Sequence, residues 1–338
     1  MGFRKTEVAA VAVLLLGLAL GSSARAEDPL RIRVAWVVPI GNWASIIYEK
    51  KDLMRHFGKS YVAEPVHFQS TPQMITALAA GELEVADLAY STFAISVENA
   101  GMSDLRIIAD ESRDGADGHQ SGEYVVLKDG PVKTIEDLKG KVLATVGVGA
   151  ALDIPVRAIL RKHGLEDKRD YTMVEVAFPN MGAMLADHKI DFMPTVAPFK
   201  FDPKLRSISR TLFTVSDALG GATDFIIWVA RAGFIAQHRA AMVDFMEDAL
   251  RGAHFFTDNE NREEVLKLAS KVSGAPVSRL GYVLTKEDAY RDPNMMPDLP
   301  SLQHAVDVQQ EVGFLKSKLD VQKYADLSLV KEAAARIK

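Results

Sequence analysis

The sequence predicts an α/β protein folded into two lobes, each a mostly parallel sheet flanked by helices. Three observations support this prediction. Short apolar runs rich in β-branched residues alternate with helical patterns up to residue 229, which is typical of parallel sheets. One sequence pattern occurs twice, which indicates two equivalent units. After residue 236 the pattern becomes almost entirely helical.

Each strand is predicted from a run of apolar residues bounded by turn residues. The predicted strands cover residues 31–38, 62–68, 85–89, 105–109, 124–127, 141–146, 173–176, 192–196 and 225–229. The first strand ends at a turn cluster that reads PIGNW, and apolar residues at helical spacing over 46–57 predict a helix after it. Further helices are expected between the later strands.

The repeated pattern marks two helices in equivalent places. Residues 72–86 read PQMITALAAGELEVA, and residues 179–193 read PNMGAMLADHKIDFM. A gapless alignment pairs proline, amide, methionine and Leu-Ala, and each block lies between two predicted strands. All βαβ units share some likeness, which is the alternative explanation. We favour two equivalent lobes, each with a helix N-terminus at a shared cleft, where unpaired N–H groups and about half a positive charge suit anions.

Two polar or small-residue segments predict where the chain passes between the lobes. Residues 112–123 read SRDGADGHQSGE, and residues 219–223 read LGGAT. We therefore assign residues 27–118 and 224–338 to lobe 1, which includes a helical C-terminal tail. Residues 119–223 are assigned to lobe 2.

The N-terminal residues predict an exported protein. A basic pair precedes an apolar run at 8–20, and residues 24–26 read ARA, which is an A-x-A cleavage pattern. Residues 1–26 are therefore predicted to be a signal peptide, since the apolar run is too short to span a bilayer. With no cysteine in the chain, disulfides, thiolate metal sites and a lipid-anchored cysteine are excluded.

The net charge disfavours polyanionic partners. Loss of residues 1–26 removes three basic residues and one acidic residue, which changes the formal charge from −5 to about −7. An acidic surface argues against nucleic acid and anionic lipid headgroups. It does not exclude a small anionic ligand, because local amides and a single cation outweigh a diffuse net charge at short range.

A glycine loop between a strand and a helix, residues 144–153, reads ATVGVGAALD. A phosphate-binding loop would need a lysine directly after its last glycine, and none follows here. In a dinucleotide fingerprint the third glycine would fall at Leu152, which is too large for close helix–strand packing. The loop is therefore predicted to form one side of a cleft, with its amides holding an acceptor group of a small solute.

Three segments resemble a known family. Residues 77–94 read ALAAGELEVADLAYSTFA, residues 134–153 contain DLKGK before the glycine loop, and residues 184–199 repeat the acidic position at Asp191. These segments are similar to periplasmic substrate-binding proteins of ABC importers in the nitrate, sulfonate and taurine group, which includes binders of a thiamine pyrimidine precursor. Glu84 stands where that family usually has aspartate, and MPT at 193–195 replaces a small-apolar run, which leaves the ligand class open.

The resemblance implies a two-lobed type II periplasmic binding protein that is not lipid-anchored and is monomeric. It implies a small-molecule ligand, an ABC permease with its cytoplasmic ATPase as partners, and no cofactor. The expected ligand is a small organic anion, a sulfonate or carboxylate with an aromatic or alkyl body. The alternatives are a pyrimidine or thiamine precursor, a periplasmic sensor that does not transport, and an enzyme on the same fold.

Loops at strand ends facing the cleft are the expected binding positions. In lobe 1 the candidates lie after the first strand, at the first helix N-terminus and after the strand 85–89: Pro39, Gly41, Asn42, Trp43, Ser70, Thr71, Gln73, Tyr90, Ser91 and Thr92. In lobe 2 and at the second crossing they are Gly149, Ala150, Ala151, Asn180, Thr195, Phe199, Thr223 and Asp224. Asp153 is expected to cap the next helix and to pair with Arg157 at the surface. Arg113 is a candidate partner for an anion.

Metal and catalytic patterns are absent from the sequence. The eight histidines show no H-x-x-x-H spacing, and no G-x-S-x-G motif occurs. A solute receptor is therefore favoured over an enzyme.

Overall fold

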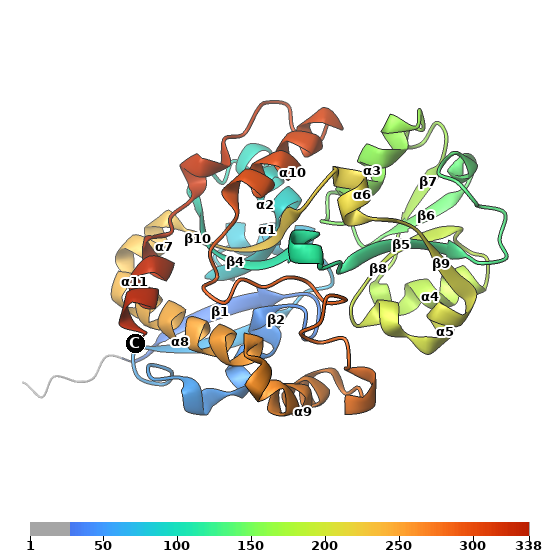
Figure 1. Cartoon of the computed structure of the whole chain (residues 1–338). Coiled ribbons are helices and arrows are strands. Elements are labelled where there is room, and N and C mark those ends of the chain that lie inside the picture. Colours follow the sequence, from blue (N-terminus) through green and yellow to red (C-terminus); the bar gives the residue numbers. More distant parts are fainter. Residues whose placement is uncertain (1–27, 338) are drawn as a thin grey trace, which may run out of the picture.

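The computed structural model describes residues 28–337 and contains two five-stranded sheets (Figure 1). The predicted signal peptide lies outside the described residues. The first sheet has the order β2-β1-β3-β10-β4, with β1 (Leu30–Trp36), β2 (Tyr61–His67), β3 (Val85–Ala89), β4 (Leu105–Asp114) and β10 (Thr223–Arg231). The second sheet has the order β7-β6-β8-β5-β9, with β5 (Gly122–Leu127), β6 (Val142–Thr145), β7 (Thr172–Glu175), β8 (Phe192–Val196) and β9 (Ser209–Thr214).

The two sheets share one topology. In the first, β1 is parallel to β2 and β3, while β10 is antiparallel to β3 and β4. In the second, β6 is parallel to β7 and β8, while β5 is antiparallel to β8 and β9. In each sheet the reversed strand is the one that arrives from the other sheet, and the remaining four run in one direction. The predicted pair of mostly parallel sheets is thus confirmed.

The chain passes from the first sheet to the second between β4 and β5, and it returns between β9 and β10. We call each sheet with its flanking helices a lobe, lobe 1 for the first sheet and lobe 2 for the second, on the right in Figure 1. The residue boundaries assigned from the sequence remain predictions.

Helices cover both faces of each sheet. They are α1 (Thr71–Ala79), α2 (Tyr90–Glu98), α3 (Asp153–Lys162), α4 (Phe178–Ala186), α5 (Pro203–Ile208), α6 (Val215–Leu219), α7 (Ala232–Gln237), α8 (Arg239–Thr257), α9 (Arg262–Ser273), α10 (Leu299–Glu311) and α11 (Ser328–Arg336). The largest core contains residues of α1, α2 and α10 from lobe 1 together with α3 and α6 from lobe 2. Helix α10 contacts α2, α3 and β10, so the C-terminal part of the chain packs against both lobes.

The repeated sequence pattern corresponds to equivalent elements. Helix α1 connects β2 to β3, and α4 connects β7 to β8. Strands β3 and β8 occupy the middle of their sheets. The internal similarity therefore reflects the shared topology of the two lobes.

Three element predictions are wrong. Residues 46–57 form no α-helix; the chain there makes the short 3-10 turns η1 (Trp43–Ser45), η2 (Ile47–Glu49) and η3 (Lys51–Leu53), because Ile46 (φ −135°) and Lys50 (ψ 57°) leave the helical region. Strand β9 was not expected, since its sequence SRTLFT is polar and it lies at a sheet edge. Most of the segment between α9 and α10 is irregular rather than helical.

Candidate functional site

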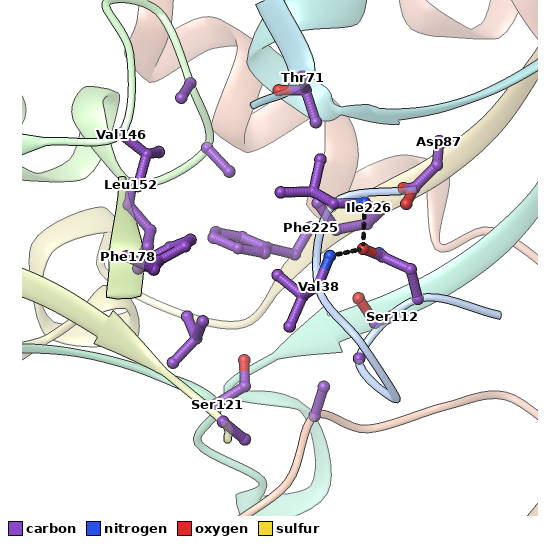
Figure 2. Close-up of a pocket in the computed structure, with 18 of the residues that line it drawn as sticks. Val38, Thr71, Asp87, Ser112, Ser121, Val146, Leu152, Phe178, Phe225 and Ile226 are labelled. Atoms are coloured by element: carbon purple, nitrogen blue, oxygen red, sulfur yellow. Dashed lines mark hydrogen bonds between the residues drawn. The ribbon is translucent and has the colours of Figure 1, made fainter. Parts of the chain in front are cut away.

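A cavity with about 710 Å³ of empty space, open solvent included, lies between the lobes (Figure 2). Lobe 1 contributes the turn after β1, the start of α1, and residues of β3, β4 and β10. Lobe 2 contributes the loop after β6, the start of α4 and the end of β8. The irregular segment before α10 adds Asp288, Ala289 and Arg291. The walls are therefore built by both lobes and by a segment distant in sequence.

Some of the candidates from the sequence line this cavity: Gly41, Asn42, Ser70, Thr71, Ala150 and Ala151. The structure places the others around it rather than in its wall: Pro39, Trp43, Gln73, Tyr90, Ser91, Thr92, Gly149, Asn180, Thr195, Phe199, Thr223 and Asp224. Their assignment as ligand contacts remains a prediction, and their positions are described below.

Asn42 holds the turn after β1 together. Its Oδ1 accepts hydrogen bonds from the N–H groups of Val37 (3.0 Å) and Val38 (2.7 Å), drawn in Figure 2, and its Nδ2 donates to Glu111 (2.5 Å). Because both ends of the carboxamide are engaged, Asn42 positions the cavity wall more than it offers free bonding capacity.

Trp43 is buried beside this turn and packs under Arg291, whose guanidinium lies 5.3 Å from the ring centroid. Arg291 also binds Asp288 (3.0 Å) and donates to the Gly41 carbonyl (3.0 Å). Arg291, which the sequence did not single out, thus lines the cavity but is already paired with a carboxylate. Pro39 lies in the same turn, partly buried.

The glycine loop faces the start of α1, as expected. A Cβ on Gly147 would lie 3.3 Å from the Ser70 hydroxyl oxygen. Two of the loop's amides are committed within the protein, because the Val148 N–H donates to Glu175 (2.9 Å) and the Gly149 N–H donates to Asp153 (2.8 Å). That the loop's amides hold a solute stays a prediction. No hydrogen bond within residues 28–337 uses the N–H groups of Ala151 and Leu152, which belong to cavity-lining residues at the start of α3.

Asp153 differs from its predicted role. It is the first residue of α3, and its carboxylate accepts from the preceding loop rather than capping its own helix. The predicted pair with Arg157 exists (2.8 Å), but it is buried rather than at the surface, since Asp153 is fully buried.

The N-termini of the two repeated helices both border the cavity, through Thr71 of α1 and Phe178 of α4. This confirms the arrangement inferred from the repeat. The Phe178 ring points toward Phe225 of β10 across the cavity interior (Figure 2). Phe199 stacks behind Phe178, with ring centroids 5.3 Å apart, and lies outside the cavity wall. The interior is therefore mainly apolar, with helix N-termini at its border.

Direct hydrogen bonds join the lobes beside the cavity. The Ser91 hydroxyl of α2 donates to the Gly149 carbonyl (2.8 Å), and the Tyr90 hydroxyl is 3.4 Å from the Ala151 carbonyl. Thr92 is hydrogen-bonded to Thr71 (2.7 Å) within lobe 1. Tyr90 and Ser91 therefore join the two lobes, whereas Thr92 does not.

The remaining candidates are spread around the cavity. Gln73 and Asn180 are exposed, and the Gln73 side chain accepts from the Gln69 N–H (3.2 Å). Thr195 and Thr223 are fully buried, and within the described residues neither hydroxyl has a hydrogen-bond partner.

Asp224 belongs to a buried acidic group at the second crossing. Its carboxylate accepts from the Asp298 N–H (2.8 Å) and adjoins Asp110, which lies 3.1 Å from Arg113. Burial raises the pKa of Asp110 to about 7, although Arg113 opposes this shift, and it raises the pKa of Asp224. Arg113 is therefore paired with this buried acidic group and does not line the cavity.

Asp87 is a cavity residue that sequence reasoning missed. It lies in the middle of β3, is fully buried and lines the cavity, and neither carboxyl oxygen has a hydrogen-bond partner in the described chain. Burial, with a smaller contribution from the Glu111 charge, raises the pKa of Asp87. A charged residue inside a five-residue buried strand is unusual enough to have served as a signal.

The described residues show neither a metal-binding cluster nor a helix able to span a bilayer. No group of three or more His, Cys, Asp or Glu side chains in residues 28–337 is arranged to hold a metal ion. None of the helices in that range combines the length and apolar character needed to cross a bilayer.

Comparison with solved structures gives proteins of the same fold. The alkanesulfonate-binding protein SsuA from Xanthomonas axonopodis pv. citri, bound to MOPS, matches with a TM-score of 0.69 and 17% identity, covering 88% of this chain and 99% of that one. The periplasmic nitrate-binding protein NrtA from Synechocystis matches with a TM-score of 0.69 and 15% identity, covering 92% and 89%. The desulfurization enzyme DSZB matches with a TM-score of 0.64 and 12% identity, covering 91% and 100%. The fold thus occurs in binding proteins and in an enzyme.

Sequence comparison shows the family directly. No curated protein matches the chain. A family model described as the NMT1-like family matches residues 25–270, which is most of the chain. With neighbours that are sulfonate- and nitrate-binding periplasmic proteins, the resemblance inferred from the sequence is confirmed. The chain belongs to the NMT1-like family.

Proposed function

We propose that the chain is a periplasmic solute receptor that holds a small organic solute with an anionic group between its lobes and delivers it to an ABC permease. The main support for this proposal is a cavity whose walls come from both lobes. Beside it, the Ser91–Gly149 hydrogen bond joins the two lobes directly. A solute in this cavity contacts both lobes and so favours the closed arrangement, which is the form a permease would recognise. The fold neighbours named as sulfonate- and nitrate-binding proteins support the same function.

The proposed place for the anionic group is the start of α3. The N–H groups of Ala151 and Leu152 have no hydrogen-bond partner in the described residues, and both residues line the cavity. Uncommitted N–H groups at a helix N-terminus, together with the helix dipole, favour an anion or carbonyl oxygen. Phe178 and Phe225 then enclose the apolar body of the solute.

A thermal-shift screen of the mature protein against sulfonates, aromatic and aliphatic carboxylates, nitrate and pyrimidines tests this function. A ligand at a hundred times its Kd stabilises the folded protein by about 2.7 kcal/mol, which raises the melting midpoint by about 4 °C at this size. A rise in melting midpoint with pyrimidines alone, or with neutral compounds alone, would contradict the proposal that the solute carries an anionic group.

Two further measurements, of uptake and of turnover, distinguish a receptor from an enzyme. Deletion of the gene should abolish uptake of the compound found in the screen, and the purified protein should return that compound unaltered. A transformed compound, or unchanged uptake in the deletion strain, would overturn the proposal. The DSZB neighbour makes the turnover assay a necessary control.

A further inference from the structure

The Asp87 carboxyl is an unsatisfied group at the cavity. Its residue is fully buried in β3, and both oxygens lack a partner in the described residues. Figure 2 shows the carboxyl pointing from its strand toward the cavity side where Ser112 and Ile226 lie. A buried carboxyl without a hydrogen bond destabilises the folded protein. Such a group at a binding cavity suggests that its partner is supplied by the ligand.

No cation that lines the cavity in the described residues is left over to pair with Asp87. Arg291, the cation lining the cavity, is bound to Asp288 and packed on Trp43. Glu111 adds a second buried carboxylate, and it takes hydrogen bonds from the Asn42 side chain, the Trp43 N–H and the Trp228 indole. Of the carboxyls of Asp87, Glu111 and Asp288, only that of Asp288 is within ion-pair distance of the guanidinium.

The two sides of the cavity thus differ in chemistry. The lobe 1 side has an excess of carboxyl groups, whereas lobe 2 contributes Ala151 and Leu152, cavity-lining residues whose N–H groups have no hydrogen-bond partner in the described residues. Phe178 and Phe225 lie between them. A ligand complementary to both sides carries a positive donor at one end, an acceptor at the other and an apolar body between.

We propose that Asp87 binds a protonated nitrogen of the solute, so that the receptor selects zwitterionic compounds, with an ammonium and an acidic group on an apolar body, over simple anions. This inference rests on the proposed receptor function and narrows its substrate class. The alternative is an Asp87 that stays protonated and donates its own O–H to an anion. The two differ in what an amide at position 87 does, because asparagine still donates an N–H but has no charge.

The test uses pairs of compounds that differ only in an ammonium group. The pairs are taurine with propanesulfonate, δ-aminovalerate with hexanoate, and para-aminomethylbenzoate with para-ethylbenzoate. Titration calorimetry measures each on wild type, on Asp87→Asn and on the exposed control Asp187→Asn. We expect wild type and control to bind an aminated compound at least ten-fold more tightly than its partner, and Asp87→Asn to lose that preference.

A second readout does not depend on the compounds. Asp87→Asn and Asp87→Leu should melt at a higher temperature than wild type when ligand-free, because each removes a buried carboxyl without a partner. Equal or tighter binding of the partners lacking the amine, or a preference that survives in Asp87→Asn, would overturn the inference while leaving the receptor intact. Failure of wild type to bind these compounds and the wider screen would instead overturn the receptor function.

Discussion

Gly149 is the position at which a single methyl group should report on lobe closure. It has φ +78°, and a Cβ added there would lie 2.7 Å from Cδ1 of Ile95 in α2, on the other lobe. Gly164, at the end of α3, has nearly the same φ (+76°) but nothing within 4 Å of an added Cβ. Gly149→Ala therefore combines backbone strain with a contact across the lobes, whereas Gly164→Ala has the strain alone.

The backbone strain and the contact with Ile95 differ in their energetic cost and in what they affect. Left-handed backbone costs an alanine about 1–2 kcal/mol, which both variants share and which lowers the melting midpoint of each by a few degrees. Moving the Ile95 side chain away from the new methyl adds about 1 kcal/mol, the cost of an unfavourable rotamer. This second cost exists only while the lobes are closed, so it should weaken solute binding by about five-fold.

Titration calorimetry with the solute found by the screen measures the difference. We expect Gly164→Ala to bind as wild type does and Gly149→Ala to bind about five-fold more weakly. Ile95→Val removes the offending Cδ1 atom, so the double variant Gly149→Ala/Ile95→Val should recover most of the affinity. Equal affinity of the two alanine variants, or no recovery in the double variant, would refute this explanation of closure.

Three further predictions concern the cavity wall. Ser91→Ala removes the hydrogen bond to the Gly149 carbonyl, so calorimetry should show affinity lowered by about 1 kcal/mol; unchanged affinity would contradict its role in closure. Asp87 has a raised pKa when folded, so its unfavourable effect on stability grows as the pH rises above its unfolded value. The excess melting temperature of Asp87→Asn over wild type should accordingly increase from about pH 5 to about pH 8, and a decrease would contradict this sign. Asn42→Ala leaves two N–H groups without a partner and removes one of the three hydrogen bonds to the buried Glu111 carboxylate, which should lower the free energy of unfolding by about 2–3 kcal/mol in urea denaturation, while the exposed control Asn180→Ala should not.

The fold could be predicted from the sequence because its central strands are buried. β3 and β8 have the bounds expected from their apolar runs, and the repeat around α1 and α4 reflects their shared topology. The helix expected over 46–57 failed because apolar periodicity also occurs in consecutive 3-10 turns that bury Ile47 and Tyr48. The local sequence pattern therefore could not distinguish an α-helix from consecutive 3-10 turns.

The cavity wall was predicted only where it follows strand ends. Ser70, Thr71, Ala150 and Ala151 were found this way. Arg291 was not, because it comes from an irregular segment that no local motif connects to the strands. The sequence could not show which loop amides are already committed, because Glu175 and Asp153, the partners of the Val148 and Gly149 N–H groups, come close to them only in the folded chain.

The most direct test of the receptor function is the distance between the lobes with and without solute. The chain has no cysteine, so Glu82→Cys in lobe 1 and Lys189→Cys in lobe 2, both at exposed positions, can be labelled alone. Single-molecule fluorescence transfer should show saturating solute gathering the molecules into one narrow population at the closed distance. An identical distance distribution with and without a bound solute would contradict closure around a ligand.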